Sequence, residues 1–152
     1  MSTQPVLYLD VDDTLINWAT LQAAPARGVR EFLPWALERF EVRWLTRRCP
    51  SGEMPEEMAR ELCGLIEIEP ALVGPVSGLN WETCESKLNG IAWLEHLVLG
   101  RPFIWVEDDF GVGETELHFL EQHGCLECYF QCNVSMDPGA LVRVHERLKE
   151  LV

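Results

Sequence analysis

Short apolar runs alternate along the chain with longer stretches in which apolar residues recur at helical spacing. Runs that end abruptly at polar residues are typical of buried strands in a parallel sheet, and they occur at residues 5–9, 42–45, 101–106 and 126–132. Helical spacing, with an apolar face every three to four positions, occurs at residues 29–40, 55–66, 86–99, 114–123 and 138–151. The pattern therefore predicts strands that alternate with helices.

This alternation predicts βαβ units with right-handed crossovers. We expect an α/β fold of the Rossmann-like, three-layer kind, with a central parallel sheet, and one domain over residues 1–152 because no linker divides the chain. Pro34 lies inside the first helical pattern, which predicts a kink or a later helix start. The least readable part is 67–83, where we expect a short strand near residues 72–76.

Composition and charge narrow the classes of protein. The chain has 152 residues, and 25 acidic against 12 basic residues give a formal net charge of −13. Such a charge repels phosphate backbones at long range, so we expect no extended nucleic-acid binding. No apolar run approaches the roughly 20 residues of a membrane helix. With no export signal visible, we expect a cytoplasmic protein that does not bind membranes, with its six cysteines reduced.

Polar residues with useful chemistry follow three of the expected strands. Because ligands of open parallel sheets bind beyond the carboxyl ends of the strands, we single out Asp10, Asp12, Asp13 and Thr14, then Thr46, then Glu107, Asp108 and Asp109, together with Lys87 before the third strand. Two carboxylates about 4 Å apart repel by roughly 4 kcal/mol at an effective dielectric near 20. Oxygen ligands without histidine or cysteine favour Mg²⁺. The threonine and the lysine are natural donors to a phosphoryl group.

In this order the residues resemble the motifs of the haloacid dehalogenase superfamily of phosphohydrolases. The resemblance rests on the D-x-D-x-T element from Asp10 to Thr14, on Thr46, on Lys87 and on the acidic run 107–109, and it covers nearly the whole chain. A response-regulator receiver domain also carries acids, threonine and lysine on a parallel sheet, but its order of residues differs. The resemblance implies a phosphatase that acts on a phosphomonoester of a small molecule or a protein.

The resemblance also implies a role for each matched residue. Asp10 would be the nucleophile that forms an aspartyl-phosphate, and Asp12 would protonate the leaving oxygen and then activate water. Thr46 and Lys87 would hold the phosphoryl oxygens. Mg²⁺ would bind to the Asp10 carboxylate, the main-chain carbonyl of Asp12 and an acid of the last motif, for which we favour Asp108. An acid at position 12, in place of a small residue, indicates a phosphatase and not a dehalogenase.

Several alternatives stay open at this point. The last motif is either Glu107-Asp108 or Asp108-Asp109. Arg47 and Arg48 either bind a second anionic group of the substrate or are ordinary loop charges, and Trp18 either lines the site or belongs to the core.

The spacing between the motifs also leaves no room for a large cap domain, so we expect an open site. The rival function is a catalytically silent member of the superfamily that binds phosphate or protein. Substrate identity and oligomeric state are not predicted.

Overall fold

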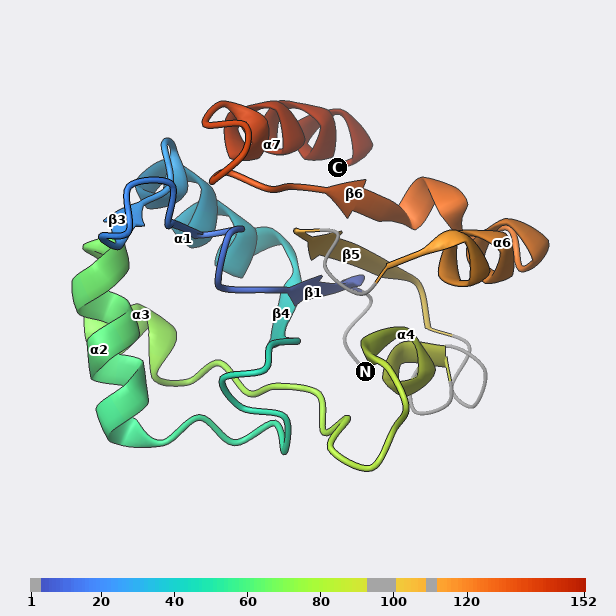
Figure 1. Cartoon of the computed structure of the whole chain (residues 1–152), viewed down its shortest axis with the longest axis horizontal. Coiled ribbons are helices and arrows are strands. Elements are labelled where there is room, and N and C mark those ends of the chain that lie inside the picture. The colour runs from blue at the N-terminus through green and yellow to red at the C-terminus, as the bar shows by residue number, and fades with distance from the viewer. Residues whose placement is uncertain (1–3, 93–100, 109–111) are drawn as a thin grey trace.

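A four-stranded parallel sheet forms the centre of the computed structural model, which describes residues 4–92, 101–108 and 112–152 (Figure 1). Its strands lie in the order β4-β1-β5-β6 and all neighbours are parallel. The bounds are β1 (Val6–Leu9), β4 (Glu41–Trp44), β5 (Phe103–Glu107) and β6 (Tyr129–Gln131). Every residue of β1 and β5 is buried, which explains their continuous apolar runs. The predicted α/β class with a parallel sheet is confirmed.

Helices connect and cover the strands. They are α1 (Val29–Arg39), α2 (Glu56–Ile66), α3 (Pro70–Val73), α4 (Lys87–Gly90), α6 (Glu114–Gln122), the 3₁₀ helix η2 (Leu126–Cys128) and α7 (Ala140–Leu151). A small antiparallel hairpin, β2 (Ile16–Asn17) with β3 (Ala24–Pro25), follows β1 and was not predicted from the sequence. Each of its strands has two residues, which is too few to show the alternation of apolar and polar residues that is typical of a strand.

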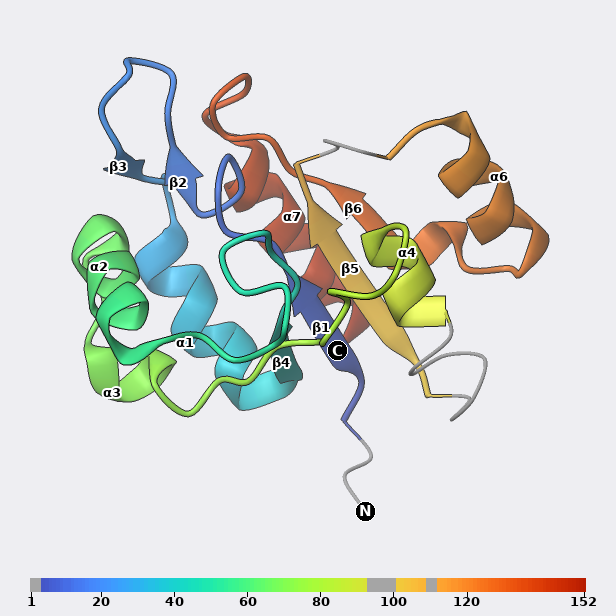
Figure 2. The same ribbon diagram turned by 60° about the horizontal axis from the view of Figure 1, so that its bottom comes forward.

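The two faces of the sheet pack against different helices. Successive residues of a strand point to opposite faces, so Leu7 and Leu9 lie in a core that includes Leu33 of α1 and Leu141 of α7. Val6 and Tyr8 lie in a second core with Leu88 of α4 and Leu120 of α6. Figure 2 shows α1 and α7 behind the sheet and α4 in front of it. The helices therefore cover the two faces of the sheet, and the ends of its strands lie outside these two packed layers.

Two expectations about helices and strands are corrected. Helix α1 begins at Val29 and continues through Pro34, so the later start is wrong. No strand forms at residues 72–76; α3 occupies Pro70–Val73 instead. Pro70 stands in the first turn of α3, where its fixed φ suits a helix and its missing N–H costs nothing. The chain reaches the edge of the sheet only at Gly78, which forms a single parallel bridge with Trp44.

The ends of other elements differ by a few residues from the prediction. The last strand was expected at 126–132, but its first part forms η2, and β6 is confined to Tyr129–Gln131. The predicted helix 86–99 is described only as far as residue 92, and Asp109 also lies outside the described residues. Within the described ranges, no helix combines the length and apolar character needed to cross a membrane.

Candidate active site

The loop after β1 is folded around a single carbonyl group. The backbone N–H groups of Thr14, Leu15 and Ile16 all donate to the carbonyl oxygen of Val11, at 3.2, 2.8 and 3.2 Å. The buried Thr14 hydroxyl lies 3.2 Å from the Cys132 carbonyl oxygen, to which it donates, and 3.4 Å from Asp10 Oδ2. These bonds tie the loop to the chain after β6 and hold its first residue, Asp10, at the end of the central strand.

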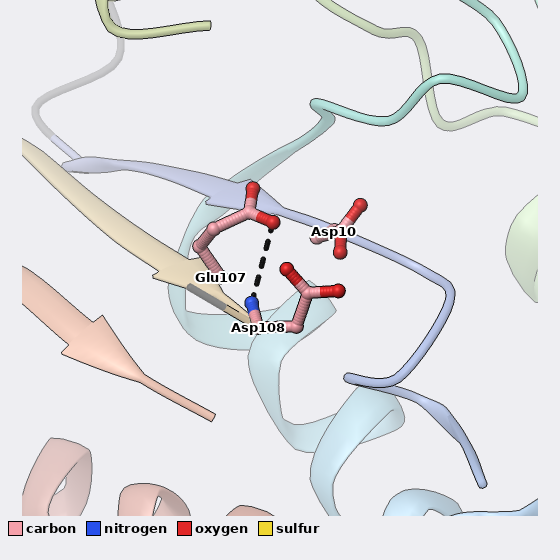
Figure 3. A group of neighbouring side chains, drawn as sticks. All are labelled: Asp10, Glu107 and Asp108. Carbon is pink, nitrogen blue, oxygen red and sulfur yellow. Dashed lines mark hydrogen bonds between the residues drawn. The ribbon is translucent and has the colours of Figure 1, made fainter. Parts of the chain in front are cut away.

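Three carboxylates meet where β1 and β5 end. Oxygen atoms of Asp10, Glu107 and Asp108 all lie within 4.8 Å of one another, and all three residues are buried. Figure 3 shows Asp10 at the end of β1, facing Glu107 and Asp108 at the end of β5. Because β1 and β5 are neighbours with Leu9 paired to Val106, the residues that follow them must come together. The predicted convergence of acids from distant parts of the sequence is therefore present.

Lys87 reaches this cluster from α4, the helix that packs on the second face of the sheet. Ser86 caps the start of α4 by accepting a hydrogen bond from the Asn89 backbone N–H, which places Lys87 in the first turn. Its Nζ lies 3.0 Å from Asp10 Oδ1 and 2.7 Å from Glu107 Oε2. The lysine side chain is 11% exposed, so both ion pairs are shielded from water. One ammonium group therefore serves two of the three clustered carboxylates.

Burial and mutual repulsion change the ionisation of this cluster. Loss of hydration raises the pKa of Asp10, an effect that Lys87 opposes and the nearby Asp108 reinforces. Burial and the charge of Asp10 raise the pKa of Glu107 to about 10, despite the ion pair with Lys87. Burial alone would lower the pKa of Lys87, but the two carboxylates together raise it. Without a further cation the cluster therefore favours holding an extra proton.

Asp12 has a different partner. Arg48 donates two hydrogen bonds of 2.8 Å to its two carboxylate oxygens, and the Trp18 indole N–H donates a third of 3.0 Å to Oδ1. Arg48 is positioned by its backbone N–H, which donates to the Thr46 hydroxyl at 3.2 Å. Asp12 is thus held by one residue from the loop after β4 and one that directly follows β2 of the hairpin.

These contacts favour the ionised form of Asp12. Burial alone would raise its pKa, but the hydrogen bonds and charge of Arg48 outweigh burial and lower it. Its side chain is 39% exposed, so the pair is partly hydrated. In this arrangement Asp12 is ionised but engaged with Arg48, and it must loosen from Arg48 before it can take up and donate a proton.

An open pocket of about 230 Å³ lies over these residues. Its described lining residues, all singled out from the sequence, are Asp10, Asp12, Asp13, Thr46, Arg47, Lys87, Glu107 and Asp108. Trp18 and Arg48, which were also considered, are not among them. Thr46 itself is buried and follows β4 directly. The fold therefore gathers Asp10, Asp12, Thr46, Lys87 and Asp108 in one pocket.

Two points at the site go beyond the sequence analysis. Glu107, one of two open choices there, turns toward Asp10 and binds Lys87, while Asp109 lies outside the described residues. Arg48, considered as a contact for substrate, is engaged with Asp12. The adjacency of Thr46 and Arg48 was visible in the sequence, but nothing in it linked Arg48 to Asp12.

The donor set of the buried cluster is suitable for a metal ion. Its three residues are all acids, so the side-chain ligands that they offer are carboxylate oxygens. Such ligands suit hard divalent cations, and a positive ion would relieve the repulsion that raises the pKa values of Asp10 and Glu107. The main-chain carbonyl expected from Asp12 belongs to the loop that lines the same pocket.

Comparison with known proteins yields no relative: no family model, no curated protein and no solved structure matches the chain.

Proposed function

We propose that this protein is a Mg²⁺-dependent phosphohydrolase that acts on phosphomonoesters through an aspartyl-phosphate intermediate on Asp10. The observation that carries the proposal is the position of Asp10: it is buried beside Glu107 and Asp108, 3.0 Å from Lys87, and lines an open pocket. A buried carboxylate next to a cation site and a fixed ammonium group can receive the phosphorus of a doubly charged ester.

The first step is attack on phosphorus by a carboxylate oxygen of Asp10. A bond forms between Asp10 and phosphorus and the bond to the leaving oxygen breaks. Asp12, released from Arg48 and protonated from solvent, supplies the proton that the leaving oxygen takes up. In the second step Asp12 removes a proton from water as the water oxygen attacks phosphorus. This restores the Asp10 carboxylate and releases inorganic phosphate.

The neighbouring residues stabilise the charge on the transferred group. Lys87 and the Thr46 hydroxyl are placed to donate to phosphoryl oxygens, and Arg47 lines the same pocket. Mg²⁺, bound by Asp10, Asp108 and the Asp12 carbonyl, would offset negative charge in the transfer. Glu107, in this proposal, orients Lys87 and leaves Asp108 as the acid of the last motif that binds the ion.

The finer fold assignment belongs to the same proposal. A β4-β1-β5-β6 parallel sheet with helices on both faces, and motif residues at the ends of β1, β4 and β5, supports a haloacid-dehalogenase-like fold. A hairpin of two-residue strands is the only element described between β1 and α1, which supports a member without a large cap.

A conservative substitution at position 10 tests the proposal. Asp10→Asn removes the nucleophile with little change in volume, so hydrolysis of p-nitrophenyl phosphate should fall to background. In wild type, EDTA should abolish the same activity and added Mg²⁺ should restore it. Asp13→Asn, a change in a carboxylate that lines the pocket but has no part in the proposed steps, is the comparison variant. Full activity in Asp10→Asn would refute the mechanism.

The rival is a phosphate- or protein-binding module without turnover. The Arg48 contact favours it to the extent that it keeps Asp12 ionised. Beryllofluoride distinguishes the two, because it forms a phosphate-like adduct on a carboxylate able to act as phosphoryl acceptor. Mass spectrometry and ¹⁹F NMR should detect a Mg²⁺-dependent adduct in wild type and none in Asp10→Asn. Phosphate binding without an adduct or turnover would favour the module.

A further inference from the structure

A second, smaller cavity adjoins the proposed phosphoryl site. It has a volume of about 120 Å³ and is named here the side pocket. Arg47 and Lys87 line both cavities, so they mark the boundary between them. A ligand with its phosphoryl group beside Lys87 therefore has its next atoms at the mouth of the side pocket. The proposal that follows rests on the proposed function, because it concerns the leaving group of the same substrate.

The residues that line only the side pocket differ in charge from those at the boundary. Among the described lining residues, the only charged side chains that line this cavity and not the proposed phosphoryl site are Glu85 and Glu116. Glu85 precedes the Ser86 cap of α4, and Glu116 lies in the first turn of α6, where it accepts a hydrogen bond from the Gly113 backbone N–H. Two separate helix starts thus contribute negative charge to one small cavity.

Two indole rings complete its wall. Trp105 of β5 is 1% exposed and packs against Tyr129, with ring centroids 5.2 Å apart. Trp81 is held by its own hydrogen bonds: its backbone N–H donates to the Pro50 carbonyl oxygen at 2.9 Å, and its indole N–H lies 3.4 Å from the Thr46 carbonyl oxygen. The aromatic wall is therefore fixed before a ligand arrives.

Carboxylates together with aromatic rings are a recognition set for organic cations. Indole is the side chain that attracts an ammonium group best, and a carboxylate adds direct charge pairing. We propose that the side pocket binds the positively charged amine of an aminoalkyl phosphomonoester, whose phosphoryl group occupies the adjoining site. The small volume limits the leaving group to a short chain that carries one ammonium group.

A matched pair of non-hydrolysable ligands tests this directly. 2-Aminoethylphosphonate and n-propylphosphonate have similar size, but only the first carries an ammonium group. In titration calorimetry with Mg²⁺ present, the aminoethyl compound should bind the wild-type protein about tenfold more tightly, as expected for a partly desolvated cation among carboxylates and aromatic rings. Equal affinities, or no measurable binding of either compound, would overturn the proposal.

Substitution of one carboxylate assigns the preference to the side pocket. Glu85→Gln should reduce the ratio of the two affinities several-fold, because it removes one charge from an exposed residue on which little packing depends. Glu82→Gln, an exposed acid on the same segment that does not line the pocket, should keep the wild-type ratio. A similar fall in both variants would indicate general attraction by an acidic surface and would count against the side pocket.

The outcomes also separate this proposal from the hydrolase function. Turnover of propyl phosphate with equal phosphonate affinities leaves the hydrolase standing and refutes the amine site. Preferential binding of 2-aminoethylphosphonate without turnover of O-phosphoethanolamine supports the amine site and refutes hydrolysis. Turnover of O-phosphoethanolamine with a KM about tenfold below that of propyl phosphate supports both.

Discussion

Two basic residues hold carboxylates at the same edge of the sheet, and the carboxylates around them ionise in opposite ways. Lys87 with Asp10 and Glu107 is shielded, with exposures of 11%, 7% and 1%, and the pKa values of both carboxyl groups are raised. Arg48 with Asp12 is partly hydrated, and the pKa of Asp12 is lowered. The contrast teaches that a salt bridge does not fix ionisation; burial and the number of acids per cation decide it.

The largest expected effect comes from removing the shielded cation. Lys87→Met leaves two buried carboxylates without their cation, which should cost roughly 3 kcal/mol of unfolding free energy at pH 7. Phosphatase activity should fall about a hundredfold or more, as for the loss of an electrostatic donor. Urea unfolding and turnover of p-nitrophenyl phosphate measure the two effects.

Lys149, the second lysine of the chain, provides the control. It forms an exposed ion pair with Glu146 on α7, so Lys149→Met should unfold at nearly the wild-type urea concentration. Equal losses in the two variants would mean that burial does not distinguish the site pair from a surface pair.

The hydrated pair should control proton transfer more than stability. Arg48 occupies both carboxylate oxygens of Asp12 and lowers its pKa, so its removal should let Asp12 carry the proton that a poor leaving oxygen needs. For Arg48→Gln we expect the ratio of kcat for ethyl phosphate, a poor leaving group, to kcat for p-nitrophenyl phosphate to rise roughly tenfold.

Arg60→Gln, which removes an exposed pair with Glu56 on α2, should leave both rates unchanged. A uniform fall of the two rates in Arg48→Gln would point to a general structural effect instead of a role at Asp12.

The raised pKa of Glu107 predicts an unusual pH dependence in metal-free protein. With the pKa near 10 in the folded state and 4.5 as its ordinary value, the folded chain holds more protons than the unfolded chain between these limits. The stability that Glu107 contributes is therefore full below about pH 4.5 and is lost as the pH rises toward 10.

Denaturation of metal-free protein between pH 5 and 9 measures this loss. Glu107→Gln, which stays neutral, should flatten the dependence of the unfolding free energy on pH. In wild type, Mg²⁺ should stabilise the protein more at high pH, because ion binding releases the proton. An identical slope in wild type and Glu107→Gln would contradict the assignment.

The smallest effect has the opposite sign and lies away from the site. His145 of α7 is 8% exposed and packs against Phe32 and Trp35; burial, aided by Lys149, lowers its pKa. The folded state resists its protonation, so stability should fall as the pH drops below about 6.5, the ordinary histidine value. His145→Gln should remove this loss of unfolding free energy at acid pH. Thermal denaturation between pH 7 and pH 5 measures the loss. If the stability of His145→Gln falls with pH as steeply as that of wild type, other groups cause the loss.

Much of the fold could be predicted because it depends on local patterns. The apolar run that ends at Asp10 and the one that ends at Glu107 each indicate a buried strand, and neighbouring parallel strands bring their ends together. The segment near residues 70–78 could not be predicted well, because Pro70, Gly74 and Pro75 are compatible with either a turn or a short helix. Packing of Val73 in the core selects the helix.

The sequence by itself determined the parallel sheet, the end of the sheet at which acids gather, and the candidates Asp10, Asp12, Thr46, Lys87 and Asp108. The sheet follows from the spacing of apolar residues, and the candidates follow from the order of the polar residues along the chain. Only the tertiary structure decided that Lys87 is shared by Asp10 and Glu107, that Arg48 holds Asp12, and that Glu85 and Glu116 line one cavity. Such pairings depend on where side chains from distant segments lie and how far water is excluded, and neither is encoded in spacing along the chain.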